Sequence, residues 1–170
     1  MGDVALTLTF RPDVAMHQIT CLPHVVALAL ARALPGCAVR WPYDVCMRES
    51  GESVCTLTSR AGYDGSMFCT VEICGLAEGE QGAKEVIQAR VDSWAKWLSG
   101  RPRMAPLAGV LEDYADALWR LGEDVSVLYP NGAPFERGTF AGIDVWGRAS
   151  VRLQDGQVLE FGPERYIISS

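Results

Sequence analysis

The C-terminal segment 122–170 constrains the fold most, because short apolar runs alternate there with turn residues at even spacing. Five strands are expected, over residues 125–129, 138–144, 149–152, 158–161 and 166–168. The turns between them are expected at Asn131-Gly132, Trp146-Gly147 and Asp155-Gly156. Short strands joined by tight turns predict a small antiparallel β-barrel. We therefore expect 122–170 to form a domain separate from residues 1–121.

The first 121 residues mix strands with helices. Apolar residues alternate with polar ones over 4–10, which predicts a half-buried strand. The helix expected over 25–34 is apolar on all sides, so it should be buried. Strands are expected at 37–41, 45–47, 54–60 and 67–74, and helices at 83–98 and 107–121. We expect Glu112, Asp113 and Asp116 on the last helix to form a solvated face. The fold class predicted is α+β with an antiparallel-rich sheet.

Charge and composition exclude some classes of function. The chain has 170 residues, a net charge of −6 and a pI of about 4.9, whereas binding to nucleic acid needs a basic face. No apolar run reaches the roughly 18–20 residues of a membrane span, and the N-terminus has no leader pattern. The six cysteines form no CxxC pair, so we expect buried thiols, no metal site and a cytoplasmic location. Neither nucleic acid nor membrane is an expected partner.

Three motifs occur in order along the chain. They are Arg40-Trp41-Pro42-Tyr43-Asp44, the strand Phe68–Ala77 and the segment Gly138–Gly147. Each resembles a motif of the biotin–protein ligases: KWPND, the strand ending in GxGIN, and the glycine-rich signature of the C-terminal barrel. The resemblance covers essentially the whole chain. It implies a class II synthetase-like sheet, here truncated, followed by an SH3-like β-barrel.

The family's chemistry joins biotin to ATP as biotinyl-AMP and then transfers biotin to a lysine of a carrier protein. A cation and a metal must offset the charge between biotin's carboxylate and the α-phosphate. The resemblance therefore implies biotin, ATP and magnesium as ligands. The family places a catalytic lysine in its K-[LI]-A-G-I segment, a basic GRGRxxR loop before the first strand of this chain, and an SxTN strand in the biotin pocket.

This sequence departs from the family at most of those positions. The SxTN strand and the basic loop are absent from it, Tyr43 replaces the asparagine of WPND, and Ser53 replaces the catalytic lysine. Thr56 stands at the close-approach glycine, and Ala77 at the asparagine of GxGIN. Removing a charge aimed at the transition state typically lowers a rate about 10²–10³-fold. We therefore expect no catalytic residue and a vestigial ligand site. Its positions are Arg40, Trp41, Tyr43, Asp44, Ser53, Thr56, Gly75 and Ala77.

Several of these positions have two interpretations. Asp44 either holds a nucleotide's metal or is a turn residue bonded to its own backbone, and we favour the turn. Trp41 lies beside a ligand or in the core. Arg40 meets a phosphate or reaches solvent at a sheet edge, and we favour the edge. His24 is expected to be a residue of the helix start rather than a base.

Three functions remain open. The first is a non-catalytic ligase-like protein that binds or regulates, with no cofactor. The second is the C-terminal subunit of a split ligase, and the third is a divergent active ligase; both would use biotin and ATP with magnesium. A truncated sheet exposes an edge. We therefore expect a homodimer or another protein to cover it, with a biotin carrier protein as a further partner.

Overall fold

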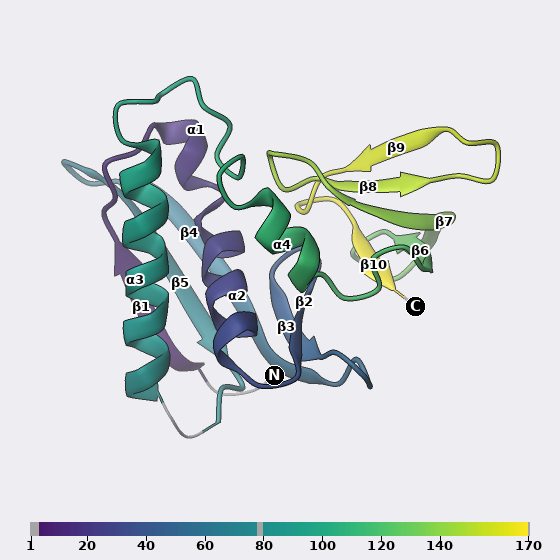
Figure 1. Ribbon diagram of the computed structural model, residues 1–170, viewed down its shortest axis with the longest axis horizontal. Coiled ribbons are helices and arrows are strands. Elements are labelled where there is room, and N and C mark those ends of the chain that lie inside the picture. Colours follow the sequence, from purple (N-terminus) through teal and green to yellow (C-terminus); the bar gives the residue numbers. More distant parts are fainter. Residues whose placement is uncertain (1–3, 78–79, 170) are drawn as a thin grey trace.

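The computed structural model describes residues 4–77 and 80–169 and contains two five-stranded antiparallel sheets (Figure 1). The first sheet has the order β1-β5-β4-β3-β2. Its strands are β1 (Val4–Phe10), β5 (Met67–Cys74), β4 (Ser53–Tyr63), β3 (Asp44–Met47) and β2 (Cys37–Arg40). Neighbouring strands all pair antiparallel, as the meander of short strands predicted. The α+β class is confirmed.

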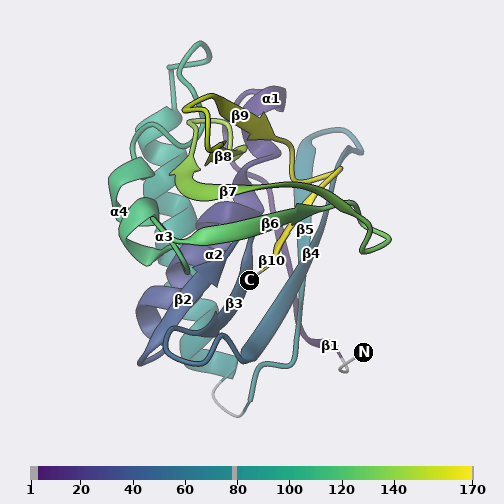
Figure 2. The same cartoon turned by 90° about the vertical axis from the view of Figure 1, so that its right-hand side faces the viewer.

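Helices cover one face of this sheet. Their bounds are α1 (Met16–Ile19), α2 (Leu22–Ala33), α3 (Glu80–Leu98) and α4 (Leu111–Ala117). Figure 2 shows them gathered on one side of the strands. Leu57, Val71 and Ile73 point to the helix side and are at most 4% exposed, while the residues between them are exposed. Nearly the whole of α2 is buried, which confirms the predicted buried helix. In the part of the chain described, no helix is long and apolar enough to cross a membrane.

The second sheet contains the five expected C-terminal strands in the order β10-β6-β7-β8-β9. The strands are β6 (Asp124–Leu128), β7 (Pro134–Ile143), β8 (Ala149–Arg152), β9 (Val158–Phe161) and β10 (Ile167–Ser169). Val127, Phe140 and Val151 form the centre of its core. Strands β9 and β10 lie at the two edges of this ladder. Closure into an SH3-like barrel and the domain boundary at residues 121–122 stay predictions.

Hydrogen bonds join the second sheet to the rest of the chain. The indole Nε1 of Trp41 donates to the carbonyl of Gly147 over 2.9 Å. The amide of Leu107 donates to the carbonyl of Val145 over 3.1 Å. These donors are buried or backbone groups, so leaving them without an acceptor would be costly. The two sheets are therefore held together by polar contacts as well as by apolar packing.

The helix predicted over residues 107–121 is much shorter in the structure. Helix α4 ends at Ala117, and Leu118 turns to extended backbone with ψ 137°. Leu118 then forms a parallel bridge with Val39, and the amide of Trp119 donates to the Val39 carbonyl. Leu118 is therefore buried against β2 as extended chain rather than as helix, while Leu121 is 42% exposed.

Two further bounds differ from the prediction. Between the expected strand at 4–10 and the expected helix at 25–34, where no element was predicted, the structure contains α1. Its Gln18 accepts from the amide of Ala15 and donates to the carbonyls of Arg101 and Met104. Strand β4 was predicted over 54–60 but extends to Tyr63, so its hairpin turn is shorter. Gln18 is 1% exposed. Its long-range partners explain why sequence spacing alone did not reveal this helix.

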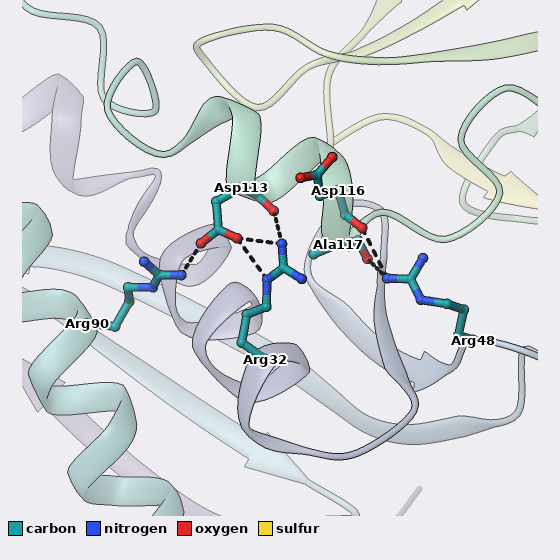
Figure 3. Close-up of polar contacts among 6 residues, drawn as sticks. All are labelled: Arg32, Arg48, Arg90, Asp113, Asp116 and Ala117. Atoms are coloured by element: carbon teal, nitrogen blue, oxygen red, sulfur yellow. Dashed lines mark hydrogen bonds and ion pairs between the residues drawn. The ribbon is translucent and has the colours of Figure 1, made fainter.

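Asp113 is not the solvated residue that was predicted. Its carboxylate forms ion pairs with Arg32 of α2 and Arg90 of α3 (Figure 3). Partial burial acts to raise the pKa of Asp113, but hydrogen bonds from the two arginines outweigh it and hold that pKa below its ordinary value. Arg48 donates to the carbonyls of Asp116 and Ala117 near the end of α4. Asp113 thus links three helices through one side chain.

Replacing Asp113 with asparagine should lower the free energy of unfolding by about 1 kcal/mol, because both ion pairs are partly exposed to solvent and screened by it. Urea unfolding measures the loss. Asp116→Asn is the matched control, since Asp116 contacts Arg48 through its backbone carbonyl. Added salt should shrink the difference between the two variants. Equal losses in both would show that the Asp113 pairs contribute nothing.

Candidate functional site

The face of the first sheet opposite the helices is polar. Alternate residues of β1, β5 and β4 point to this side, which we call the open face. Its polar members among the described residues are Thr7, Thr9, Thr56, Thr58, Arg60, Thr70 and Glu72. A hollow of about 240 Å³ there is lined by Thr58, Ser59, Arg60, Thr70 and Glu72. Hydroxyls, a carboxylate and a guanidinium in one hollow can bind a small polar ligand.

Hydrogen bonds between strands order part of the open face. The hydroxyls of Thr9 and Thr70 lie 2.9 Å apart across β1 and β5. Thr58 donates to the carboxylate of Glu72 over 3.4 Å. These contacts join residues on neighbouring strands, where side chains on one face meet. The hollow is thus lined by side chains that are partly held in place.

One end of the open face is built around Phe68. The guanidinium carbons of Arg11 and Arg60 lie 5.4 Å and 5.9 Å from its ring centroid. Arg11 also donates to both carboxylate oxygens of Asp64, over 2.7 Å and 2.8 Å. That hydrogen bond holds the pKa of Asp64 below its ordinary value. Arg60 forms no ion pair with any described residue, so its charge remains available on this face.

Trp41 belongs to the core. The side chain is 3% exposed, and its indole nitrogen donates a hydrogen bond to the carbonyl of Gly147. The peptide bond between Trp41 and Pro42 is cis. The Pro42 carbonyl accepts a 2.5 Å hydrogen bond from the hydroxyl of Tyr114 in α4. Of the two interpretations of Trp41, the structure supports the core residue.

Asp44 has a structural bond that differs from the one predicted. Its Oδ1 accepts from the amide of Leu57 over 3.1 Å, so it contacts β4 and not its own backbone. The pairing of β3 with β4 is irregular next to it, between Val45 and Cys46. Burial raises the pKa of Asp44, against opposing effects of the Leu57 amide and Arg40. The carboxylate therefore replaces part of an interrupted strand ladder.

Arg40 is occupied by protein groups. Its guanidinium donates to the carbonyl of Gly51 and lies 4.9 Å from the ring of Trp119. Gly51 must be glycine here, because a Cβ would lie 2.4 Å from the Trp119 ring. The Nε of Arg40 is buried and has no hydrogen-bond partner among the described residues. Arg40 is therefore half-buried beside Trp119 and does not extend into solvent as predicted.

The remaining predicted positions lie together at one end of β4 and β5. Ser53 begins β4 opposite Cys46, and Thr56 pairs with Cys74. Gly75 follows β5 with φ 86°, and a Cβ there would lie 3.2 Å from the carbonyl of Val54. The exposed residues of this group are Ser53, Thr56, Gly75 and Ala77. They are not joined by Arg40 or Trp41, which are turned toward other contacts.

Sequence reasoning missed the residues of the hollow. Thr58 and Arg60 lie outside the motifs, in a part of β4 where consecutive residues are exposed and no alternation is seen. Glu72 lies within the motif strand Phe68–Ala77, between the buried Val71 and Ile73. For Glu72, that alternation was the available signal, since period two assigns residues to one face of a strand.

His24 lies in the first turn of α2, as expected, and its side chain is buried. Its ring lies 5.2 Å from that of Tyr43 and 5.9 Å from that of Tyr114. Neither ring nitrogen has a hydrogen-bond partner among the described residues. Burial lowers the pKa of His24 to about 4, although the backbones of Gly147 and Cys21 and the charge of Asp144 act to raise it. A neutral imidazole thus packs behind Tyr43 of the WPYD segment.

The described part of the chain contains no group of three metal-ligating side chains placed to hold an ion. Burial raises the pKa of Cys21 and Cys55 to about 12 and that of Cys69 to about 11. These thiols therefore stay protonated at neutral pH. Since the thiolate is the reactive form, these cysteines suit packing better than nucleophilic chemistry.

The fold is that of the biotin protein ligases. A biotin protein ligase from Aquifex aeolicus superposes with a TM-score of 0.71 at 14% identity, covering 96% of this chain and 80% of that one. The apo structure of that enzyme superposes with a TM-score of 0.70 at 15% identity and the same coverage of both chains. The complex of that enzyme with biotin and ATP gives 0.68 at 14% identity, covering 96% and 76%. No protein-family model matches the sequence, and no curated protein matches it. The predicted ligase-like fold is confirmed.

Proposed function

We propose that this biotin-ligase-like protein has no ligase activity on its own and acts as a binding or regulatory module. The observation that supports this most is Ser53. The resemblance places the catalytic lysine there, but the structure has an exposed serine at the start of β4. Without a cation at this point, the charge between a carboxylate and an α-phosphate is not offset.

Arg60 does not compensate for the serine. Both residues lie on β4, seven positions apart, which corresponds to about 23 Å along an extended strand. That distance is much longer than an arginine side chain. Arg40 does not replace the lysine charge either, because its guanidinium contacts the Gly51 carbonyl and the Trp119 ring. Arg60 is thus too far from Ser53 to replace the lysine, and Arg40 is engaged by other protein groups.

The test combines the pure chain with biotin, ATP, magnesium and a carrier domain. We expect no biotinylated carrier by mass spectrometry, and no biotin or ATP binding by calorimetry. An active ligase in a parallel reaction shows that the carrier is competent. Ser53→Lys should remain inactive, because Tyr43 and Ala77 still differ from the family. Transfer of biotin to the carrier by the wild-type chain would overturn the proposal. Tight binding of biotin or ATP would contradict the interpretation of the site as vestigial.

The alternative proposal is a subunit of a two-chain ligase. It is supported by the charge of Arg60, which forms no ion pair with a described residue, on an open polar face. In that case transfer would appear only when a second chain with the basic loop is added. The reaction of the chain alone separates this alternative from a divergent active ligase.

A further inference from the structure

The second sheet carries a polar hollow of its own. Its volume is about 410 Å³, and it lies over β6, β7 and β8. Its polar lining side chains are those of Asp124, Arg137, Thr139, Arg152 and Gln154, and Gly138 lies between Arg137 and Thr139 on β7. None of these residues lines the hollow on the open face of the first sheet. The two hollows can therefore be tested separately.

Strand register places the two arginines side by side. Thr139 pairs with Asp124 on one side and with Arg152 on the other. Arg137 precedes Thr139 by two residues on β7, so it shares that face and lies diagonal to Arg152. Such diagonal neighbours are about 7–8 Å apart, within reach of long side chains.

Gly138 makes this close approach possible. A Cβ at Gly138 would lie 2.4 Å from the carbonyl oxygen of Arg152 and 2.8 Å from Val151. Any larger residue would push β7 away from β8. The glycine therefore keeps Arg137 close to Arg152 across the two strands.

The Asp124 carboxylate lines the same hollow, but it forms no ion pair with either guanidinium group. Among the described residues, neither Arg137 nor Arg152 has an ion pair or a side-chain hydrogen bond. Arg148 in the same sheet, by contrast, pairs with Asp144 and Glu160. Asp124 accepts a 3.1 Å hydrogen bond from Thr139. Two neighbouring like charges repel each other, and an anion between them would remove that repulsion.

We propose that this hollow binds an oxyanion, a phosphate or carboxylate group of a small ligand. Planar guanidinium groups bind such oxygens in pairs of parallel hydrogen bonds. The Gln154 amide adds donors at the same hollow. The Asp124 carboxylate and the net charge of −6 disfavour an extended polyanion. The inference goes beyond the proposed function and does not depend on the first sheet.

The test follows backbone amide shifts by NMR as inorganic phosphate is added to the full chain, with sodium chloride holding ionic strength constant. Saturable shifts are expected at Thr139 and Arg152. Arg137→Gln and Arg152→Gln should each weaken binding about tenfold or more, because charge-assisted hydrogen bonds are lost. The same titration is repeated with methyl phosphate and with acetate. Saturation by methyl phosphate assigns a phosphate ester, and saturation by acetate alone assigns a carboxylate.

Arg165→Gln is the matched control, because Arg165 is an exposed arginine in the same C-terminal segment. Its affinity for phosphate should equal that of the wild type. All variants should keep the wild-type thermal unfolding midpoint, since these side chains are on the surface. The proposal fails if no anion saturates, if Arg165→Gln weakens binding as much, or if Arg60→Gln abolishes it instead.

Discussion

Replacing Gly147 with alanine is expected to lower the free energy of unfolding by about 3 kcal/mol, close to the upper end of overpacking effects. The new Cβ would lie 2.5 Å from Nε2 of His24 and 2.7 Å from its Cε1. The His24 ring is buried against Tyr43 and Tyr114, so it has no free space to move into. Gly147 also has φ 82°, a conformation that alanine adopts at a cost.

Gly156→Ala is the matched control for that variant. Gly156 has φ 85° in another turn of the second sheet, and no atom lies within 4 Å of its built Cβ. Its loss should be about 1 kcal/mol, from backbone strain alone. Guanidinium unfolding measures both. Combining Gly147→Ala with His24→Ala should recover part of the loss, as expected for residues in contact. Equal losses for the two glycines would show that the His24 contact is not rigid.

The elements of this fold could be predicted where the signal is local. Period-two alternation located β1, and the turn glycines located most of the second sheet. The all-round apolarity of residues 25–34 predicted a buried helix. Each of these signals arises from side chains near one another in the sequence.

Contacts between distant residues could not be predicted in the same way. The motif at residues 40–44 was found, but the partner of Trp41 is a carbonyl 106 positions away. The bond from Leu57 to Asp44 depends on a local irregularity between β3 and β4. Asp113 appeared solvated because Arg32 and Arg90 come from other helices. Sequence patterns identify the faces of elements, whereas side-chain pairing depends on how the elements meet.

Acidification should unfold this protein more readily, because His24 must gain a proton to become charged. Its pKa is about 4 in the folded state and 6.5 when unperturbed. Between these values the unfolded state binds more protons, so stability falls as pH drops from about 6.5 to about 4. A difference of 2.5 pKa units corresponds to about 3 kcal/mol. The cause is burial of a ring whose two nitrogens have no partner among the described residues.

The titratable groups around the imidazole do not reverse the effect of burial on its pKa. Tyr43, Tyr114 and Cys21 are neutral near pH 7, because burial raises the pKa of each. Asp144 favours the charged ring, but burial outweighs it. Asp44 acts oppositely: burial raises its pKa, so protonation stabilises the fold at the acid end of the window. Asp113, whose pKa is lowered, loses its contribution only at lower pH.

Urea unfolding at several pH values isolates the contribution of His24. His24→Leu should be close to the wild type or more stable at pH 7, because an apolar side chain replaces two unpaired nitrogens. Between pH 6.5 and 4, the free energy of unfolding of this variant should decrease much less than that of the wild type. His17→Gln is the control, because His17 is exposed. The stability of this variant should depend on pH as that of the wild type does. An unchanged profile in His24→Leu would mean that other groups cause the acid sensitivity. A profile flattened by His17→Gln would assign the acid sensitivity to His17 of α1 instead of His24 of α2.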